Sequence, residues 1–180
     1  LADPYWPKKA MEGHPEDIVP CLRCSNCYHI SSDHWNVGCS VNPRYHHQEF
    51  VPSEINLPKA ETKKYVVILG GGQAGMKAAI TASDRGHKVT IIEKQKELGG
   101  MLRFISKEAH KEEVQRLLDY YLTQIFKREI EVLLNTEADP ELVKELQPDS
   151  LLIAFGAVER ILPIPGVEGE KVQLATKAIA

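Results

Sequence analysis

The strongest constraint on the fold is a stretch that begins at Tyr65 and reads YVVILGGGQAGMKAAITASDRGHKVTIIEK. It opens with a continuous apolar run, which is typical of a strand buried in a parallel sheet. Glycines with the spacing G-x-G-x-x-G follow at once, then a helical segment and a second apolar run. Strand, glycine turn, helix and strand in this order predict an α/β fold, a Rossmann-like FAD/NAD(P)-binding unit with a parallel sheet.

Each glycine of the pattern has a physical role. Gly70 permits the tight turn after the strand, Gly72 lets the backbone approach a pyrophosphate, and Gly75 allows the helix to pack close to the strand. Gln73 and Ala74 lie at the start of the helix, where free N–H groups and the positive end of the helix dipole favour an anion. We therefore expect these residues to bind the phosphates of a dinucleotide or of ADP.

Two further features extend the expected nucleotide site. Glu93 ends the second apolar run, 18 positions after Gly75, where it can accept hydrogen bonds from a ribose hydroxyl; Lys94 follows it. Gly99 and Gly100 come next and would let the backbone run beside a second part of an extended ligand. The pair is common in flavoproteins with two dinucleotide-binding units, so it favours FAD over NAD, although it also suits an ordinary loop.

All four cysteines lie in one short segment with the spacing C-x2-C-x2-C-x11-C. Cys21, Cys24 and Cys27 can converge on one face of a metal centre, and Cys39 can close the site. Four thiolates suit a [4Fe–4S] cluster or zinc. Zinc usually takes two separated pairs, so the spacing favours the cluster, with a structural zinc site as the alternative. Disulfides are disfavoured, because cysteines three residues apart seldom bridge without strain. Four cysteines already complete a coordination shell, so we expect the nearby histidines to lie at the surface or next to the ligands without binding the metal. These histidines are His29, His34, His46 and His47.

The composition changes once along the chain, near LPKAETKK. Residues 1–62 lack sustained periodicity and predict a loop-rich segment that carries the cysteines, whereas residues 63–180 predict a dinucleotide-binding domain that is incomplete at its C-terminal end. A helix is expected from residue 107 to 129, a strand in IEVLLN, a short helix capped by Asp139, and another buried strand in SLLIAFG. The first and last residues suggest a piece of a longer protein.

Charge and hydropathy exclude two classes of partner. The chain has 22 Lys and Arg against 25 Asp and Glu, and the basic residues are scattered, so nucleic acid is not an expected partner. The longest apolar runs, YVVIL and LLIAF, are far shorter than the roughly 20 residues that span a bilayer, and no signal-peptide pattern is present. We expect a cytoplasmic protein without a membrane partner, and the composition leaves homo-oligomerisation open.

Taken together, these motifs resemble the C-terminal half of the NADH:flavin oxidoreductases of the old yellow enzyme class, which include 2,4-dienoyl-CoA reductase, trimethylamine dehydrogenase and enoate reductases. The resemblance spans nearly the whole chain and is carried by CLRCSNC, CSVNPR, VVILGGGQAGMKAA, IIEK, LGG and LLIAFGAVERILPIPGVEG. In that family NAD(P)H reduces FAD, FAD passes electrons to a [4Fe–4S] cluster, and the cluster passes them to FMN in a TIM barrel. A similar FAD unit occurs in the small subunit of glutamate synthase, whose relatives carry more cysteines.

The resemblance implies roles for particular residues. Ala154 and Gly156 match a strand end beside the cofactor, with Phe155 where the family usually has threonine. The four cysteines match the cluster ligands, and the glycines and Glu93 match the FAD site, at which trimethylamine dehydrogenase holds ADP. The FMN-bearing barrel and the NAD(P)H domain are expected in other parts of the parent protein, so this chain alone is not expected to turn over a substrate.

Overall fold

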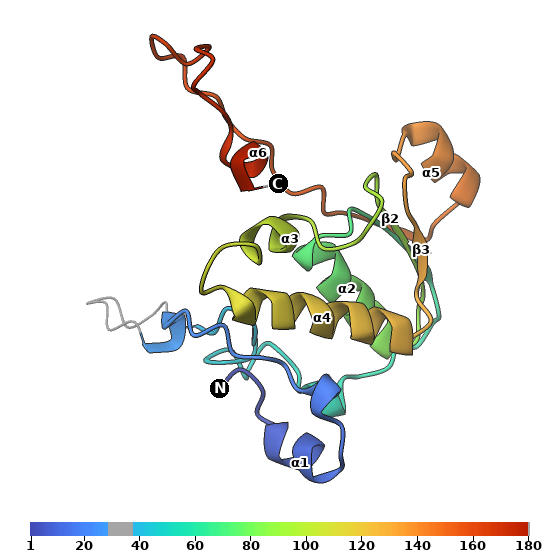
Figure 1. Cartoon of the computed structure of the whole chain (residues 1–180). Coiled ribbons are helices and arrows are strands. Elements are labelled where there is room, and N and C mark those ends of the chain that lie inside the picture. The colour runs from blue at the N-terminus through green and yellow to red at the C-terminus, as the bar shows by residue number, and fades with distance from the viewer. Residues whose placement is uncertain (29–37, 180) are drawn as a thin grey trace.

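A four-stranded parallel sheet forms the centre of the molecule in the computed structural model, which describes residues 1–28 and 38–179 (Figure 1). Its strands lie in the order β3-β2-β1-β4, and the register places Leu69 beside both Ile92 and Ile153. The carboxyl ends of β2, β1 and β4 therefore meet at one edge of the sheet. The strands are β1 (Tyr65–Leu69), β2 (Lys88–Ile92), β3 (Glu131–Leu133) and β4 (Ser150–Ile153).

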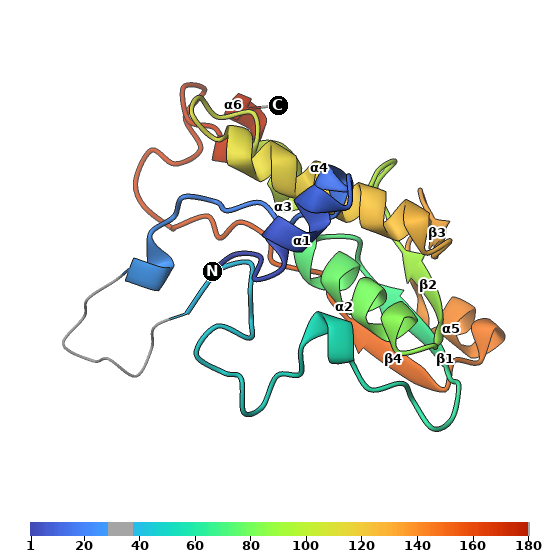
Figure 2. The same cartoon turned by 90° about the horizontal axis from the view of Figure 1, so that it is seen from below.

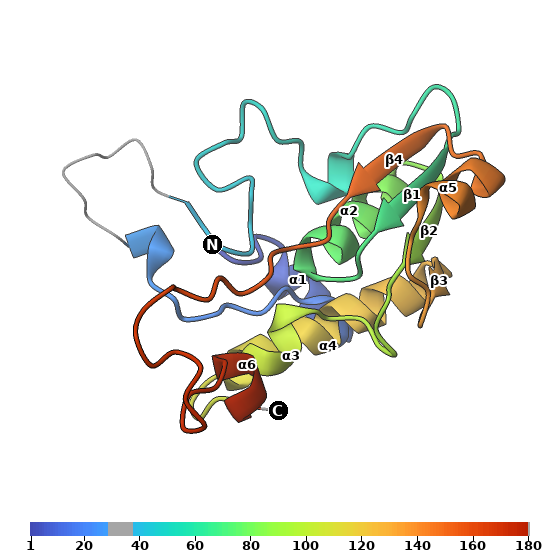
Figure 3. The same ribbon diagram turned by 90° about the horizontal axis from the view of Figure 1, so that it is seen from above.

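Helices connect the strands and cover both faces of the sheet. On one face, α2 and α4 pack over Ile68 and Ile91, and on the other α5 packs over Val67 and Ile92. Figure 3 shows this layered arrangement from above. It confirms the predicted α/β fold with a parallel sheet. The helices of this part are α2 (Gln73–Asp84), α3 (Met101–Ile105), α4 (Glu112–Lys127), α5 (Pro140–Leu146) and α6 (Ala175–Ile179).

The apolar residues whose spacing predicted the long helix lie on the buried face of α4. Leu117, Leu118, Tyr121 and Ile125 are buried on this face, whereas Asp119 is exposed. The helix begins five residues later than expected, at Glu112, because His110 adopts a positive φ of 66° that interrupts the helical backbone. These side chains serve packing rather than chemistry, as the pattern indicated.

The N-terminal segment is loop-rich, with α1 (Trp6–Met11) and short 3-10 helices at Pro15–Asp17, Asn26–Tyr28 and Glu54–Asn56. It packs against the part of the chain that holds the sheet rather than standing apart from it (Figure 2). Val19 and Val41 belong to the same buried cluster as α2 and α4. Gln124 and Lys127 on α4 each donate a hydrogen bond of 2.7 Å to Asp17. The domain boundary at residue 62 therefore stays a prediction.

The expectation that SLLIAFG forms a buried strand is wrong in one respect. The segment is a strand, but Leu151, Leu152 and Ile153 are 42%, 38% and 66% exposed. β4 pairs only with β1, and none of its residues joins a buried cluster in the described part of the chain. Apolar composition alone cannot reveal whether another layer covers a strand. Among the helices that the structure describes, none combines the length and apolarity needed to cross a membrane.

Candidate functional site

The glycine turn between β1 and α2 has a geometry that only glycine permits at two positions. Gly70 adopts a φ of 107°, and a Cβ at this residue would collide with the carbonyl oxygen of Ala154. A Cβ at Gly75 would collide with the carbonyl oxygen of Gly70. The first contact brings the end of β4 against the turn, and the second sets the close approach of α2 to β1. Ala154 thus lies against the glycine turn, and its contact with a cofactor stays a prediction.

The N-terminus of α2 is open to a ligand. Gly72 is its N-cap residue and provides no capping side chain, and the first turn holds no acidic residue. The backbone N–H groups of Gln73, Ala74 and Gly75 have no helical acceptor, as in every helix start. A Cβ at Gly72 would meet nothing within 4 Å, so there is free space above the turn. Free N–H groups and the helix dipole make this a suitable position for phosphate.

Replacing Gly72 with alanine tests this assignment. Because Gly72 has a φ of −76° and free space around it, Gly72→Ala is expected to leave the melting temperature nearly unchanged. The added methyl group occupies the space above the turn, so the affinity for ADP in calorimetry is expected to fall by about tenfold or more. Ser83→Ala, near the other end of α2, is the control. An unchanged ADP affinity in Gly72→Ala would contradict the placement of phosphate here.

Glu93 has a second role that the sequence did not reveal. Its side chain is buried, and each carboxylate oxygen accepts a backbone N–H: Oε2 from Gly71 at 2.7 Å and Oε1 from Gln95 at 2.8 Å. The carboxylate therefore braces the glycine turn. A carboxylate has about four acceptor positions, so lone pairs remain for ribose hydroxyls, and that role stays a prediction. Lys94 is exposed at the same strand end.

The glycine pair lies directly against the glycine turn. The N–H of Gly99 donates to the carbonyl of Gly71 at 2.8 Å, and a Cβ at Gly100 would lie 3.2 Å from the Cα of Gly72. Both glycines have positive φ, 124° and 50°. Gly71, which the sequence reasoning missed, is in contact with Glu93 and would collide with Leu98 if it carried a Cβ. Gly156 adopts a φ of 76° in exposed chain after β4, where its Cβ position is open.

The cysteine segment makes tight turns, and its thiols form no disulfide. Arg23 and Ser25 have positive φ values of 50° and 57°, so the chain turns sharply on either side of Cys24. The amide of Asn26 donates to the carbonyl of Gly38 at 3.1 Å, which joins the first turn to the segment before Cys39. None of the four cysteines forms a disulfide: Cys21 and Cys24 are exposed, and Cys27 and Cys39 are partly buried.

No three cysteine sulfurs among the described residues lie within 4.8 Å of one another. Around a tetrahedral zinc, four thiolates at 2.3 Å would lie about 3.8 Å from one another. The choice between zinc and a cluster therefore stays a prediction from the cysteine spacing in the sequence. The one described group that meets this distance criterion is His14, Glu16 and Asp17, in which His14 and Glu16 are exposed and both carboxylates pair with Lys127.

Hydrogen bonds and one ion pair hold the cysteine segment in place. The backbone N–H of Arg23 donates to the sulfur of Cys21 at 3.4 Å, and the Arg23 side chain pairs with Glu113 on α4. A hydrogen bond of 3.2 Å with the Ser40 hydroxyl lowers the pKa of the Cys24 thiol, which favours the thiolate that binds metals. His46 and His47 are exposed, whereas His29 and His34 lie outside the described residues.

A pocket of about 390 Å³ lies between Cys39 and the first turn of α2. Cys39 lines it on one side, and Gln73 and Ala74, at the start of α2, line it on the other. Tyr121 of α4 also borders the pocket, and burial raises the pKa of its phenol, so the hydroxyl is neutral. The tertiary structure thus places the fourth cysteine beside the end of α2 at which phosphate is expected.

Comparisons with known proteins agree with this geometry. The chain is 40% identical to the NADH oxidase of Thermoanaerobacter brockii, over 94% of this chain and 26% of that relative. It is 37% identical to the cinnamate reductase of Clostridium sporogenes, over 93% of this chain and 25% of that relative. The solved structure of a 2-naphthoyl-CoA reductase with 2-naphthoyl-CoA matches with a TM-score of 0.90 and 36% identity, over 99% of this chain and 27% of that one.

The chain therefore spans about a quarter of the length of the curated relatives it matches. These relatives are oxidoreductases by name, and they confirm the resemblance to the C-terminal part of NADH:flavin oxidoreductases that the motifs predicted. The family model described as pyridine nucleotide-disulphide oxidoreductase matches residues 63–179, which include the sheet and the glycine turn. The chain belongs to the pyridine nucleotide-disulphide oxidoreductase family.

Proposed function

We propose that this chain is the electron-transfer part of an NAD(P)H-dependent flavin and iron–sulfur oxidoreductase. It relays electrons from FAD through a [4Fe–4S] cluster to FMN in a barrel formed by another part of the parent protein. The observation that carries the proposal is the pocket shared by Cys39 and the N-terminus of α2, because electron transfer needs the two cofactors close together. The FMN barrel and the NAD(P)H domain are the proposed partners, in keeping with relatives about four times as long.

The residues of this chain bind and position the cofactors in this proposal. The backbone at Gly72, Gln73 and Ala74 binds the pyrophosphate, and Glu93 binds the adenosine ribose while it braces the turn. The glycine pair at Gly99 and Gly100 leaves room for an extended ligand to pass. The cluster, held by Cys21, Cys24, Cys27 and Cys39, supplies one-electron transfer when it is bound.

The alternative is a non-catalytic module that binds ADP at the same turn and holds a structural zinc ion with its cysteines. The same four thiolates would serve, and ADP needs only the phosphate and ribose contacts. The cysteine spacing argues against it, since zinc usually takes two separated pairs, whereas three of the four cysteines here lie in one compact run.

Analysis of the anaerobically isolated chain separates the two functions. We expect iron and acid-labile sulfide in about equal amounts, at about four of each per chain as a [4Fe–4S] centre requires, and a visible absorbance that dithionite bleaches. Chromatography of the nucleotide released by denaturation is expected to yield FAD. Stoichiometric zinc without sulfide would select the alternative, and recovery of ADP in place of FAD would assign a structural nucleotide to the turn.

A further inference from the structure

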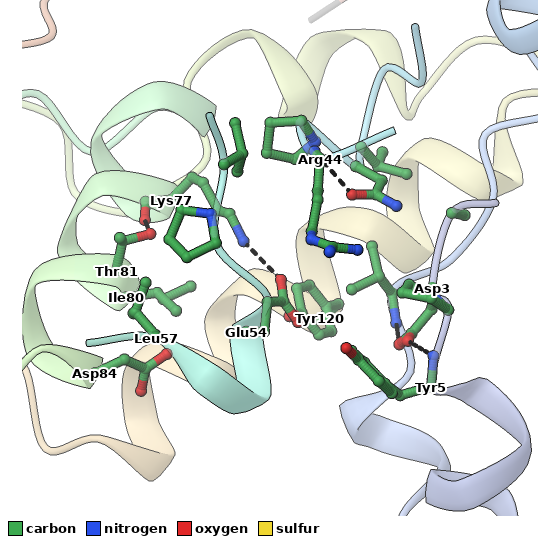
Figure 4. Close-up of a pocket in the computed structure, with 18 of the residues that line it drawn as sticks. Asp3, Tyr5, Arg44, Glu54, Leu57, Lys77, Ile80, Thr81, Asp84 and Tyr120 are labelled. Atoms are coloured by element: carbon green, nitrogen blue, oxygen red, sulfur yellow. Dashed lines mark hydrogen bonds and ion pairs between the residues drawn. The ribbon is translucent and has the colours of Figure 1, made fainter. Parts of the chain in front are cut away.

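A second pocket lies along the C-terminal half of α2, away from the glycine turn. It has a volume of about 430 Å³ and is enclosed by the N-terminal segment, the 3-10 helix at Glu54–Asn56, α2 and α4 (Figure 4). This volume falls in the range of small-molecule sites in proteins. Most of the lining is apolar, and it includes Val19, Pro52, Leu57, Pro58, Ile80 and Tyr120.

The charges in the lining are unbalanced. Three carboxylates border the pocket, and each already has a cationic partner, so none of them is available to a further cation. The pairs are Asp3 with Lys9 at 2.6 Å, Glu54 with Lys77 at 3.0 Å, and Asp84 with Arg128 at 2.7 Å. Two further arginines border the pocket. Neither forms an ion pair among the described residues; Arg85 donates its Nε to the carbonyl of Pro58 at 3.3 Å, whereas the side chain of Arg44 has no hydrogen-bond acceptor there.

Arg44 has a buried donor without an acceptor. Its backbone N–H bonds to the side chain of Asn42 at 3.0 Å, which holds the turn, and Figure 4 shows its guanidinium directed into the pocket. Its Nε is buried and has no hydrogen-bond partner, the one such side-chain atom found among the described residues. That nitrogen has almost no accessible surface, so a ligand in the pocket would meet the two terminal nitrogens of the guanidinium, which form no hydrogen bond or ion pair with the described residues. Polar groups of this kind are nearly always satisfied in folded proteins, which points to an acceptor that a ligand supplies.

We propose that this pocket binds a small organic carboxylate. The carboxylate accepts a paired hydrogen bond from the guanidinium of Arg44, whose planar fork matches its geometry. The apolar body of the ligand contacts Leu57, Ile80 and Pro52. An apolar lining with the guanidinium of Arg44 directed into the cavity suits such a molecule better than a nucleotide or an inorganic phosphate, which need several donors. Neither the glycine turn nor any cysteine lines this pocket. The proposal therefore does not depend on whether the proposed electron transfer is correct.

Fluorine NMR of two matched probes tests the proposal on the 180-residue chain. 4-Fluorobenzoate and 4-fluorobenzamide have nearly the same shape, but only the first carries a charge. We expect saturable binding of 4-fluorobenzoate and affinity about tenfold or more weaker for the amide, as the loss of a charge-assisted hydrogen bond to Arg44 requires. Non-saturable binding of both probes, or equal affinities for the two, would overturn the proposal.

Variants locate the binding to this pocket. Arg44→Met is expected to remove the preference for the carboxylate, whereas Arg160→Met, at an exposed arginine after β4, keeps it. Leu57→Trp fills the pocket and leaves Arg44 in place, so it is expected to abolish binding of both probes. This variant keeps the test decisive if Arg44→Met unfolds, which circular dichroism reports. Wild-type affinity in a folded Arg44→Met or Leu57→Trp chain would refute the site.

Discussion

Replacing Cys24 with alanine is expected to remove nearly all iron and sulfide from the anaerobically isolated chain. Cys24 is the central residue of the tight turn between Arg23 and Ser25, and no further cysteine exists in the sequence to replace it. A cube held by three thiolates exposes one iron to solvent, and Cys24 is itself exposed, so oxygen and chelators reach the damaged centre. Metal analysis and the visible spectrum measure the loss.

Two further variants control this result. Ser25→Ala changes an exposed neighbour that has no thiol, and it is expected to keep the iron content of the wild type. Ser40→Ala removes the hydroxyl that bonds to the sulfur of Cys24 but leaves all four thiolates, so the cluster is expected to form with altered stability. Full retention of iron and sulfide in Cys24→Ala would show that this residue is no ligand, and with it the four-thiolate centre would be refuted.

The second large effect is expected from Gly75→Ala, which should destabilise the fold. The new methyl group collides with the carbonyl oxygen of Gly70, so α2 must move away from β1 and the core beneath it must open. Overpacking costs about 1–3 kcal/mol, and the collision with backbone places this variant at the upper end of that range. In a chain of this size, that lowers the melting temperature by roughly 6–12 °C.

Gly72→Ala is the matched control for Gly75→Ala. Both variants add one methyl group to the same turn, yet the group meets backbone at Gly75 and free space at Gly72. Thermal unfolding followed by circular dichroism should therefore show a large decrease for Gly75→Ala and almost none for Gly72→Ala. Equal melting temperatures for the two variants would mean that the glycine turn does not have the close contact between α2 and β1 described here.

The local sequence was sufficient to predict much of the fold. The steric limits on backbone conformation explain why Gly70 and Gly75 could be assigned to a strand–turn–helix unit. Asp139 was expected to cap a short helix, and its side chain accepts a hydrogen bond from the N–H of Leu142 at 2.7 Å at the start of α5. The apolar positions of α4 were also predictable. Each of these features depends on interactions within a few residues along the chain.

The site, by contrast, depends on contacts between distant residues. Sequence spacing suggested Glu93 as a ribose ligand, but only the tertiary structure shows that it braces the N–H of Gly71. The sequence leaves the glycine pair open to an ordinary loop or a ligand contact, and only the tertiary structure shows that the N–H of Gly99 donates to the carbonyl of Gly71. Likewise, the composition of β4 gave no sign that its side chains are exposed, because burial depends on the neighbouring layer and not on the strand itself.

The sequence by itself determined the parallel α/β fold, the glycine turn and the four cysteines that are candidate metal ligands. Backbone sterics, helical periodicity and side-chain chemistry are local properties, so the sequence reveals them directly. Only the tertiary structure decided that Cys39 borders the start of α2, that Val19 and Val41 share the core of the sheet, and that Arg44 has a buried donor without an acceptor. These are consequences of long-range packing, in which the burial of apolar surface brings together segments that no local pattern relates.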